Sequence, residues 1–184
     1  MVKIIETKEE TKDRIEGERE EKDSFFKTHP QSPIPTEEKD NFNGLNYYQV
    51  KLKLKFILKL YEHKDKNKTG VNDNTGKKQA FLRWGEFRFK IDGKQVILQA
   101  YKNNHNDERL WVPFKDETNK DETYGAGRYI DLEPPQCMEG DNWILDFNLA
   151  YNPFCAYSSY YVCPFIPPEN WILVKIEAGE KKYK

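Results

Sequence analysis

The feature that most restricts the fold of this chain is a strict alternation of side chains over residues 81–91. Phe87 and Phe89 fall on one face of an extended chain, and the charged residues between them fall on the other. A two-residue period is typical of a β-strand with one face buried. The Asp92-Gly93 pair that follows is a strong signal for a two-residue hairpin. Residues 96–101 are then the return strand of an antiparallel sheet.

Other segments of the chain carry a similar pattern. Residues 51–56 alternate Lys with Leu and Phe, which predicts a strand extending toward residue 61. The polar residues 63–79 read as a long hairpin loop. Short strands separated by turn signals are typical of a sandwich or barrel. We therefore predict a mainly β fold, an antiparallel sandwich or barrel of about eight strands, with further strands at 109–114, 123–132, 143–147 and 172–176.

The N-terminal part of the chain has a different character. Residues 3–28 are dense in Glu, Lys, Asp and Arg, and Glu/Lys pairs three or four apart support a helix. Its middle is polar all round, so we expect only the end at Phe25-Phe26 to dock on the body. His29-Pro30 should end the helix, because a residue before proline avoids the helical region. Thr36 could cap a short helical turn.

These patterns predict a helical arm at residues 1–28 and a single mostly β domain at residues 29–184. A chain of 184 residues suits one such domain. Residues 1–40 hold 8 Lys and Arg against 12 Asp and Glu, so the arm is acidic.

The overall composition excludes several partners. A net charge of -1 gives no global field toward nucleic acid or an anionic membrane. The Lys-rich residues 51–68 contain few aromatics for stacking on bases, which disfavours nucleic-acid binding. No apolar run approaches the roughly 20 residues of a membrane helix. The N-terminus carries no hydrophobic signal segment, so we expect a cytoplasmic protein with its cysteines as thiols.

Two segments differ from the charged remainder. Residues 123–132 read TYGAGRYIDL, and residues 146–170 read DFNLAYNPFCAYSSYYVCPFIPPEN. Charge is sparse there, while rings, Gly, Pro, Asn and Cys accumulate. Such a mixture is typical of packed irregular loops, where function is often carried. We therefore expect a pocket for a small polar ligand between TYGAGRY and DFNLAYN.

The polar side chains of these two segments are the candidate ligand contacts. Two glycines let the backbone approach a ligand closely, and a guanidinium can clamp a carboxylate or phosphate. A strand from 143 would place Asp146 and Asn148 on one face. The same groups, if buried, would instead form a satisfied structural network, and the sequence leaves both readings open. The candidate residues are Tyr124, Arg128, Asp131, Asp146, Asn148, Tyr151 and Asn152.

The cysteines allow several readings. Cys155 and Cys163 are too far apart for the usual zinc spacing and have no second ligand pair, so we predict no metal site. A hairpin between them could form a disulfide, although a cytosolic setting favours thiols. A catalytic Cys155 would need a base beside it, and the sequence points no histidine at it. Two buried, inert thiols remain the main reading.

The motifs together resemble a known family. TYGAGRY, DFN-x-AYNP-x-CAY, CP followed by PPEN, and AGEK are similar to the family filed as domain of unknown function 1684. SFFKTHPQSPIP, NFNGLNYY and FLRWGEFRF add to the resemblance, which spans roughly residues 20–182. It implies no established activity and no cofactor. The resemblance leads us to expect Arg where this chain has Leu149 and Trp171. Any role that a cation has at those two positions in the family is therefore not expected in this chain.

Three functional hypotheses follow. The first is a small-ligand binding module that uses the pocket described above. The second is a hydrolase-type enzyme that uses Asp146 or Cys155. The third is a protein-interaction module that docks a protein partner through the acidic arm.

Overall fold

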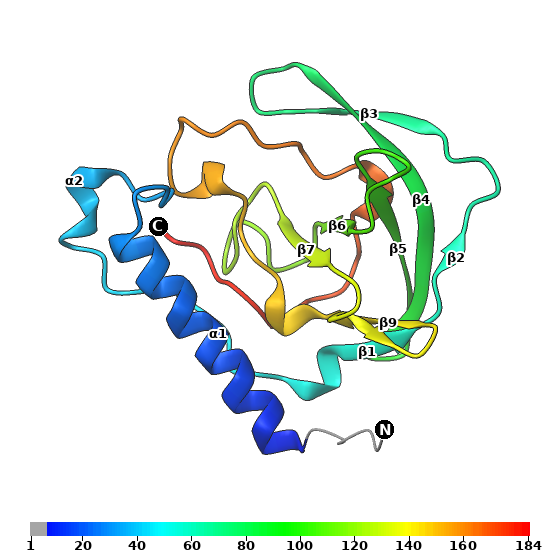
Figure 1. Ribbon diagram of the computed structural model, residues 1–184, viewed down its shortest axis with the longest axis horizontal. Coiled ribbons are helices and arrows are strands. Elements are labelled where there is room, and N and C mark those ends of the chain that lie inside the picture. Colours follow the sequence, from blue (N-terminus) through cyan, green and yellow to red (C-terminus); the bar gives the residue numbers. More distant parts are fainter. Residues whose placement is uncertain (1–6) are drawn as a thin grey trace.

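Two antiparallel β-sheets pack on each other beside one long helix in the computed structural model, which describes residues 7–184 (Figure 1). The larger sheet has the order β2-β4-β5-β6-β7, with β3 also paired to β4. Its strands are β2 (Tyr61–Glu62), β3 (Lys68–Asn72), β4 (Lys78–Ile91), β5 (Lys94–Lys102), β6 (Leu110–Phe114) and β7 (Arg128–Leu132).

The smaller sheet has the order β1-β9-β8, formed by β1 (Lys55–Leu58), β8 (Met138–Glu139) and β9 (Asn142–Asp146). The prediction of a mainly β fold is confirmed, and of its two forms the sandwich is the one that fits. Within residues 7–184 neither sheet closes on itself as a barrel would.

The main core lies between the two sheets. Phe87 and Leu98 of the larger sheet and Phe147, just after β9, are fully buried. The ring centroid of Phe56 on β1 lies 4.8 Å from that of Phe89 on β4, which joins the sheets directly. The alternation along β4 therefore places its aromatic face in the core between the sheets, where burial of the rings stabilises the fold.

The β4–β5 hairpin forms as the sequence predicts. Ile91 pairs with Lys94, so the loop is the two residues Asp92 and Gly93. Both have positive φ, 47° and 82°, which matches the right-handed twist of the flanking strands.

Residues 63–79 are not a single long loop. They contain β3 and the start of β4, which pair from Lys68↔Leu82 to Asn72↔Lys78. The turn between these strands is closed by Asp73, whose Oδ1 accepts hydrogen bonds from the backbone N–H groups of Thr75 and Lys77. The polar composition correctly indicated the turn. It did not indicate β3, because the outward face of that strand is exposed to solvent and polar.

Two further predicted strands are shorter than expected. Residues Leu52–Leu54 form a 3₁₀ turn, and β1 begins only at Lys55. Residues 123–127 form turns, and β7 begins at Arg128. Gly127 has a φ of 102°, a conformation that cannot continue a strand.

The strand expected at residues 172–176 is absent from both sheets of the described structure, and the chain bends at Leu173 and Val174. Burial still alternates, since Ile172, Val174 and Ile176 are buried while Leu173 is 78% exposed. The backbone N–H of Ile176 donates to the Asp116 carboxylate at 2.6 Å rather than to a neighbouring strand. The backbone groups of Ile172 and Val174 bond those of Lys115 and Glu117, just after β6. Irregular backbone bonds and one side chain thus replace the ladder that the alternation predicted.

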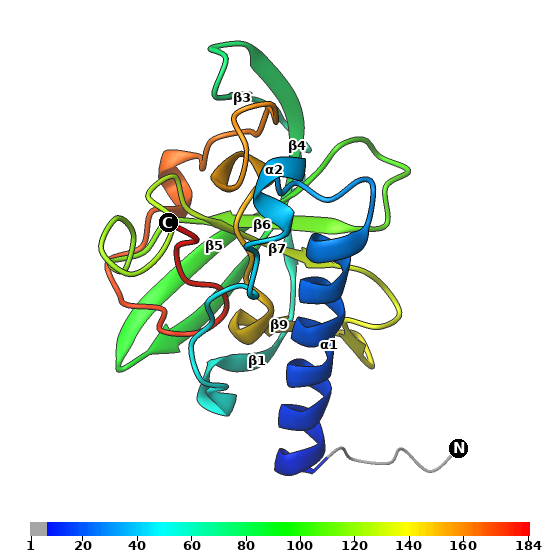
Figure 2. The same ribbon diagram turned by 90° about the vertical axis from the view of Figure 1, so that its left-hand side faces the viewer.

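The helix α1 (Lys8–Thr28) lies along the outside of the sandwich (Figures 1 and 2). Thr7 and Glu10 form a reciprocal capping box at its start. It ends at His29, whose extended backbone precedes proline as predicted. Residues 3–6 of the predicted helix lie outside the described residues.

The helix is docked along its length and not only at its end. Ile15 in its middle is fully buried, and Phe26 is 2% exposed. The short helix α2 (Thr36–Lys39) follows, and its N-cap is Pro35 rather than Thr36. The middle of α1 looked polar all round because only one narrow stripe of it is apolar.

Truncation of Ile15 tests this docking. Ile15→Ala is expected to lower the free energy of unfolding by about 3 kcal/mol, since it removes a fully buried side chain between the helix and the body. Ile57→Ala, at a half-exposed position on β1, should cost less than about 1 kcal/mol. Chemical denaturation measures both. Equal, small losses would show that the helix docks only through its end.

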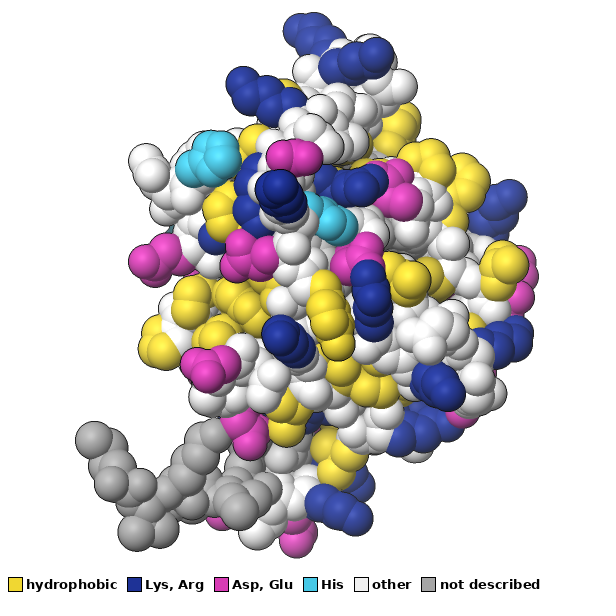
Figure 3. Space-filling model, turned by 90° about the vertical axis from the view of Figure 1, so that its right-hand side faces the viewer, with side chains coloured by type: hydrophobic (Ala, Val, Ile, Leu, Met, Phe, Trp, Pro, Cys, Tyr) yellow, Lys and Arg dark blue, Asp and Glu magenta, His cyan; other side chains and the backbone are white. Residues whose placement is uncertain are grey.

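The surface over β2 and β4 carries charges of both signs (Figure 3). Lys66 pairs with Glu62 at 2.7 Å, and Arg88 pairs with Glu86 at 2.6 Å. Basic side chains there are interspersed with acidic ones rather than gathered into one basic patch. Among residues 7–184, no helix has the length and apolar character needed to cross a membrane.

Candidate functional site

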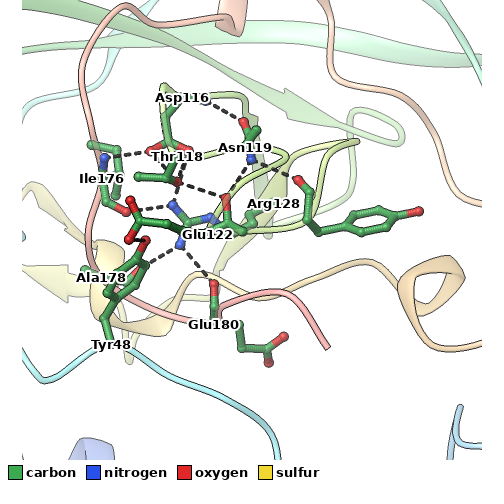
Figure 4. Close-up of polar contacts among 11 residues, drawn as sticks. Tyr48, Asp116, Thr118, Asn119, Glu122, Arg128, Ile176, Ala178 and Glu180 are labelled. Atoms are coloured by element: carbon green, nitrogen blue, oxygen red, sulfur yellow. Dashed lines mark hydrogen bonds and ion pairs between the residues drawn. The ribbon is translucent and has the colours of Figure 1, made fainter. Parts of the chain in front are cut away.

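Arg128 lies at the centre of a buried polar cluster (Figure 4). Its side chain is fully buried, and its two terminal nitrogens donate to the carbonyl oxygens of Ile176, Ala178 and Glu180. One of them also lies 3.3 Å from Asp116 Oδ1. Burial lowers the pKa of Arg128, and the carboxylate of Asp116 opposes that shift.

The partners of this cluster are all protein groups. Asp116 accepts from the Thr118 hydroxyl at 2.9 Å and from Ile176 N–H at 2.6 Å. The cluster therefore joins the C-terminal segment to β7. Arg128 is thus part of a buried structural network, which was one of the two alternatives the sequence left open. Its Nε is the exception, since it is buried with no partner among the described residues.

Asp146 and Asn148 also lie together, but not as strand alternation predicted. β9 ends at Asp146, and Phe147–Leu149 form a 3₁₀ turn. Asp146 Oδ1 accepts from the backbone and side-chain nitrogens of Asn148, at 2.9 and 2.8 Å. Burial raises the pKa of Asp146, which is 2% exposed. Asn148 in turn holds both backbone groups of Lys51.

The remaining candidates divide between two places. The Tyr151 hydroxyl donates to Asp131 at 2.6 Å, and burial raises the pKa of that carboxyl. Asn152 bonds the C-terminal segment through Glu180 and Lys181.

Tyr124 lies apart from these residues, with its hydroxyl 3.8 Å from Cys155 Sγ. The seven predicted residues thus do not converge on one cleft between TYGAGRY and DFNLAYN.

A pocket of about 240 Å³ instead lies between α1 and the DFNLAYN segment. We call it the α1 pocket. Asn148 and Tyr151 are the two predicted residues that line it. The helix supplies one wall, and the C-terminal segment supplies another, where Tyr47 and Glu180 pair as an isolated β-bridge. Its lining residues are Ile15, Glu18, Arg19, Lys22, Tyr47, Asn148, Leu149, Ala150, Tyr151 and Glu180.

The acids of the α1 pocket already have cationic partners. Glu180 is 1% exposed and pairs with Lys22, and it also accepts from Asn152 N–H and the Tyr157 hydroxyl. Glu18 pairs with Arg14 at 2.6 Å. These two carboxylates are therefore neutralised by neighbours.

Arg19 is different, because none of its hydrogen-bond acceptors is a carboxylate. Its terminal nitrogens donate to the backbone oxygens of Tyr48 and Asn148, at 3.0 and 3.3 Å. Its Nε is buried with no partner among the described residues. Its guanidinium lies 4.5 Å from the centre of the Tyr47 ring. Burial lowers the pKa of Arg19, and the charges of Tyr47, Glu16, Asp146 and Glu180 only partly oppose that shift.

Tyr47 adds a second open donor. Its hydroxyl is buried and has no partner among residues 7–184. Burial raises the pKa of Tyr47, so the phenol stays protonated at neutral pH and can donate. A buried donor without a partner costs free energy that a bound acceptor would recover.

Sequence reasoning missed the helix side of this pocket. Ile15, Arg19, Lys22 and Phe26 are spaced by four, three and four residues, which places them on one face of a helix. The spacing of these four residues is visible in the sequence. Arg19 and Lys22 are charged, however, so the stripe was interpreted as solvent-exposed surface. Glu180 gave no local signal at all.

The fold and the pocket define a β-sandwich protein whose N-terminal helix closes one side of a pocket. The family model described as Protein of unknown function (DUF1684) matches residues 40–181, so the chain belongs to that family. The matched region begins after α1. The resemblance seen in the motifs is confirmed.

One solved structure is similar to this chain in both sequence and fold. An uncharacterized protein of Haloarcula marismortui, determined by solution NMR, is 36% identical to this chain. The match covers 95% of this chain and 97% of that one, with a TM-score of 0.71. No curated protein matches the sequence.

Proposed function

We propose that this protein binds a small organic anion in the α1 pocket. The observation that carries the proposal is the half-buried guanidinium of Arg19, which has no carboxylate partner and an open Nε. Unpaired buried charge is costly, and a ligand carboxylate would compensate it. The Tyr47 hydroxyl is a second donor for the same ligand.

The shape and walls of the pocket restrict the ligand further. Ile15, Leu149 and Ala150 are apolar, and Tyr47 and Tyr151 present rings. Binding sites with apolar walls and a few placed polar groups take ligands with an apolar body. Because Glu18 pairs with Arg14 and Glu180 pairs with Lys22, Arg19 is the lining cation whose hydrogen-bond acceptors are backbone oxygens, not carboxylates. A monocarboxylate with a short aliphatic or flat aromatic body fits these conditions.

Thermal shift with matched probes tests the charge requirement. Butyrate and benzoate are each compared with their neutral amides, butyramide and benzamide, at constant ionic strength. The carboxylates are expected to raise the melting temperature, since a ligand that binds only the folded state stabilises it. The amides share the shape but not the charge, and should not. Equal shifts from acid and amide would contradict the anion site.

Substitution of Arg19 tests where the carboxylate binds. Arg19→Met should abolish the shift given by the carboxylate, and Arg19→Lys should retain part of it. Lys12→Met removes an exposed cation from the same helix and is the matched control. An undiminished shift in Arg19→Met would place the binding site elsewhere. Native mass spectrometry of freshly purified protein complements this, because a co-purifying mass lost in Arg19→Met identifies the ligand.

The hydrolase alternative, which would use Asp146 or Cys155, stays a prediction of the sequence. Asp146 is buried and does not line the α1 pocket. A catalytic Cys155 would need a base such as histidine beside it. The three histidines, all in the described part of the chain, have other neighbours: His29 stacks on Phe25, His63 bonds Gln99, and His105 contacts Trp84. The interaction hypothesis stays a prediction that would use the outward face of α1.

A further inference from the structure

Cys155 and Cys163 lie together outside the α1 pocket. The backbone N–H of Cys155 donates to Cys163 Sγ, 3.4 Å away, and each thiol is the largest influence on the pKa of the other. Both are free thiols in this structure. Seven residues separate them, so the contact closes a small loop.

The backbone on each side of the pair is fixed. Cys155 is the central residue of the 3₁₀ turn Phe154–Ala156. Cys163 exchanges two hydrogen bonds with Asn74 in the β3–β4 turn: its N–H donates to Asn74 Oδ1 at 2.9 Å, and its carbonyl accepts from Asn74 N–H at 3.2 Å. The two cysteines are thus held beside each other by elements that are themselves anchored.

The surroundings make the two sulfur atoms unequal. Cys163 Sγ accepts a hydrogen bond from the Cys155 backbone N–H. The neighbouring Cys155 thiol and backbone N–H groups lower the pKa of Cys163. The neighbouring Cys163 thiol, together with burial, raises the pKa of Cys155. Since the thiolate is the nucleophile, Cys163 is the sulfur that reacts first. Cys155 is the neighbour placed to react second.

We propose that Cys155 and Cys163 form an oxidation site that hydrogen peroxide converts reversibly into a disulfide. The Cys163 thiolate attacks the peroxide, the O–O bond breaks, and hydroxide leaves and takes up a proton as water. Cys163 is then a sulfenic acid. Cys155 sulfur attacks it, the S–O bond breaks, and the oxygen leaves as water with the Cys155 proton. The two electrons lost by the thiols reduce the peroxide.

The site favours a small oxidant. Cys163 is 9% exposed and Cys155 is half-buried, so hydrogen peroxide can reach the pair more readily than glutathione disulfide. Cys137 is not part of the pair, and burial raises its pKa, which keeps it as an unreactive thiol. This proposal does not depend on the ligand pocket.

Peroxide treatment of the native protein tests the proposal. We expect an intact mass lower by two hydrogen atoms, a Cys155–Cys163 linked peptide after digestion, and full reversal by dithiothreitol. Cys155→Ser should stop at the first step, so dimedone should label Cys163. Cys163→Ser should give neither product. Cys137→Ser is the matched control and should behave like the unmodified chain.

Several outcomes would overturn it. These are a folded protein that forms no disulfide under peroxide, a linkage through Cys137, or dimedone labelling of Cys155 in Cys163→Ser at the wild-type rate. Oxidation by glutathione disulfide as fast as by peroxide would overturn the choice of oxidant. Circular dichroism of each variant confirms that it is folded before the comparison is made.

Discussion

Replacing Arg128 with methionine is expected to lower the free energy of unfolding by about 3–5 kcal/mol, because it leaves a buried carboxylate without its cation. Asp116 has a fully buried side chain, and three backbone carbonyls lose their donor at the same time. Denaturation with urea measures the loss. Hydrogen exchange over residues 171–184 should show the C-terminal segment opening first.

Arg109→Met is the matched control for that substitution. Its guanidinium is 40% exposed and pairs with Asp131 at 3.5 Å, so its removal should cost less than about 1 kcal/mol. If Arg128→Met does not fold, Asp116→Asn provides a milder variant that keeps an acceptor for Thr118 and Ile176. A loss at Arg128 no larger than that at Arg109 would show that the cluster does not hold the C-terminal segment.

Replacing Gly127 with alanine is expected to cost about 3–5 kcal/mol, from positive φ and from overpacking together. Its φ is 102°, and an added Cβ would lie 2.5 Å from Ile166 Cγ1 and 2.8 Å from the Phe114 carbonyl oxygen. Neither neighbour can move easily, since Ile166 is buried and Phe114 is in β6.

Gly76 separates these two causes. Its φ is 84°, but an added Cβ would meet nothing within 4 Å. Gly76→Ala should therefore cost only the conformational part, about 1 kcal/mol. Thermal and chemical denaturation of both variants give the difference. Equal losses would show that the close approach at Gly127 contributes nothing.

The Gly-rich TYGAGRY segment illustrates how a motif can mislead about function. Its glycine, arginine and tyrosine types fit a ligand loop as well as a packed turn. In the structure, Gly127 fits against β6 and Arg128 bonds the C-terminal segment. Whether Arg128 binds a ligand or the protein depends on whether another part of the chain provides its hydrogen-bond acceptors. A residue 50 positions downstream provides one of them.

The α1 pocket shows the converse case. Arg19 looked like one more charge in a solvated helix, because local sequence does not say which side of a helix meets a body. Docking of Ile15 turned that face inward and left Arg19 half-buried. The consequence for Arg19 arises from desolvation, which only the packed structure imposes.

The sequence by itself determined the local elements of this protein: the alternating strand β4, the Asp92-Gly93 hairpin, the end of α1 at His29 and the mainly β class. These depend on side-chain period and backbone preference, which act over a few residues. Packing between distant segments makes Ile176 bond the Asp116 carboxylate, places Arg128 inside the protein, and lets α1, Tyr47 and Glu180 enclose a pocket. Those outcomes depend on contacts between residues about 50 to 160 positions apart, such as Arg128 with Ile176 and Lys22 with Glu180, and no local pattern encodes them.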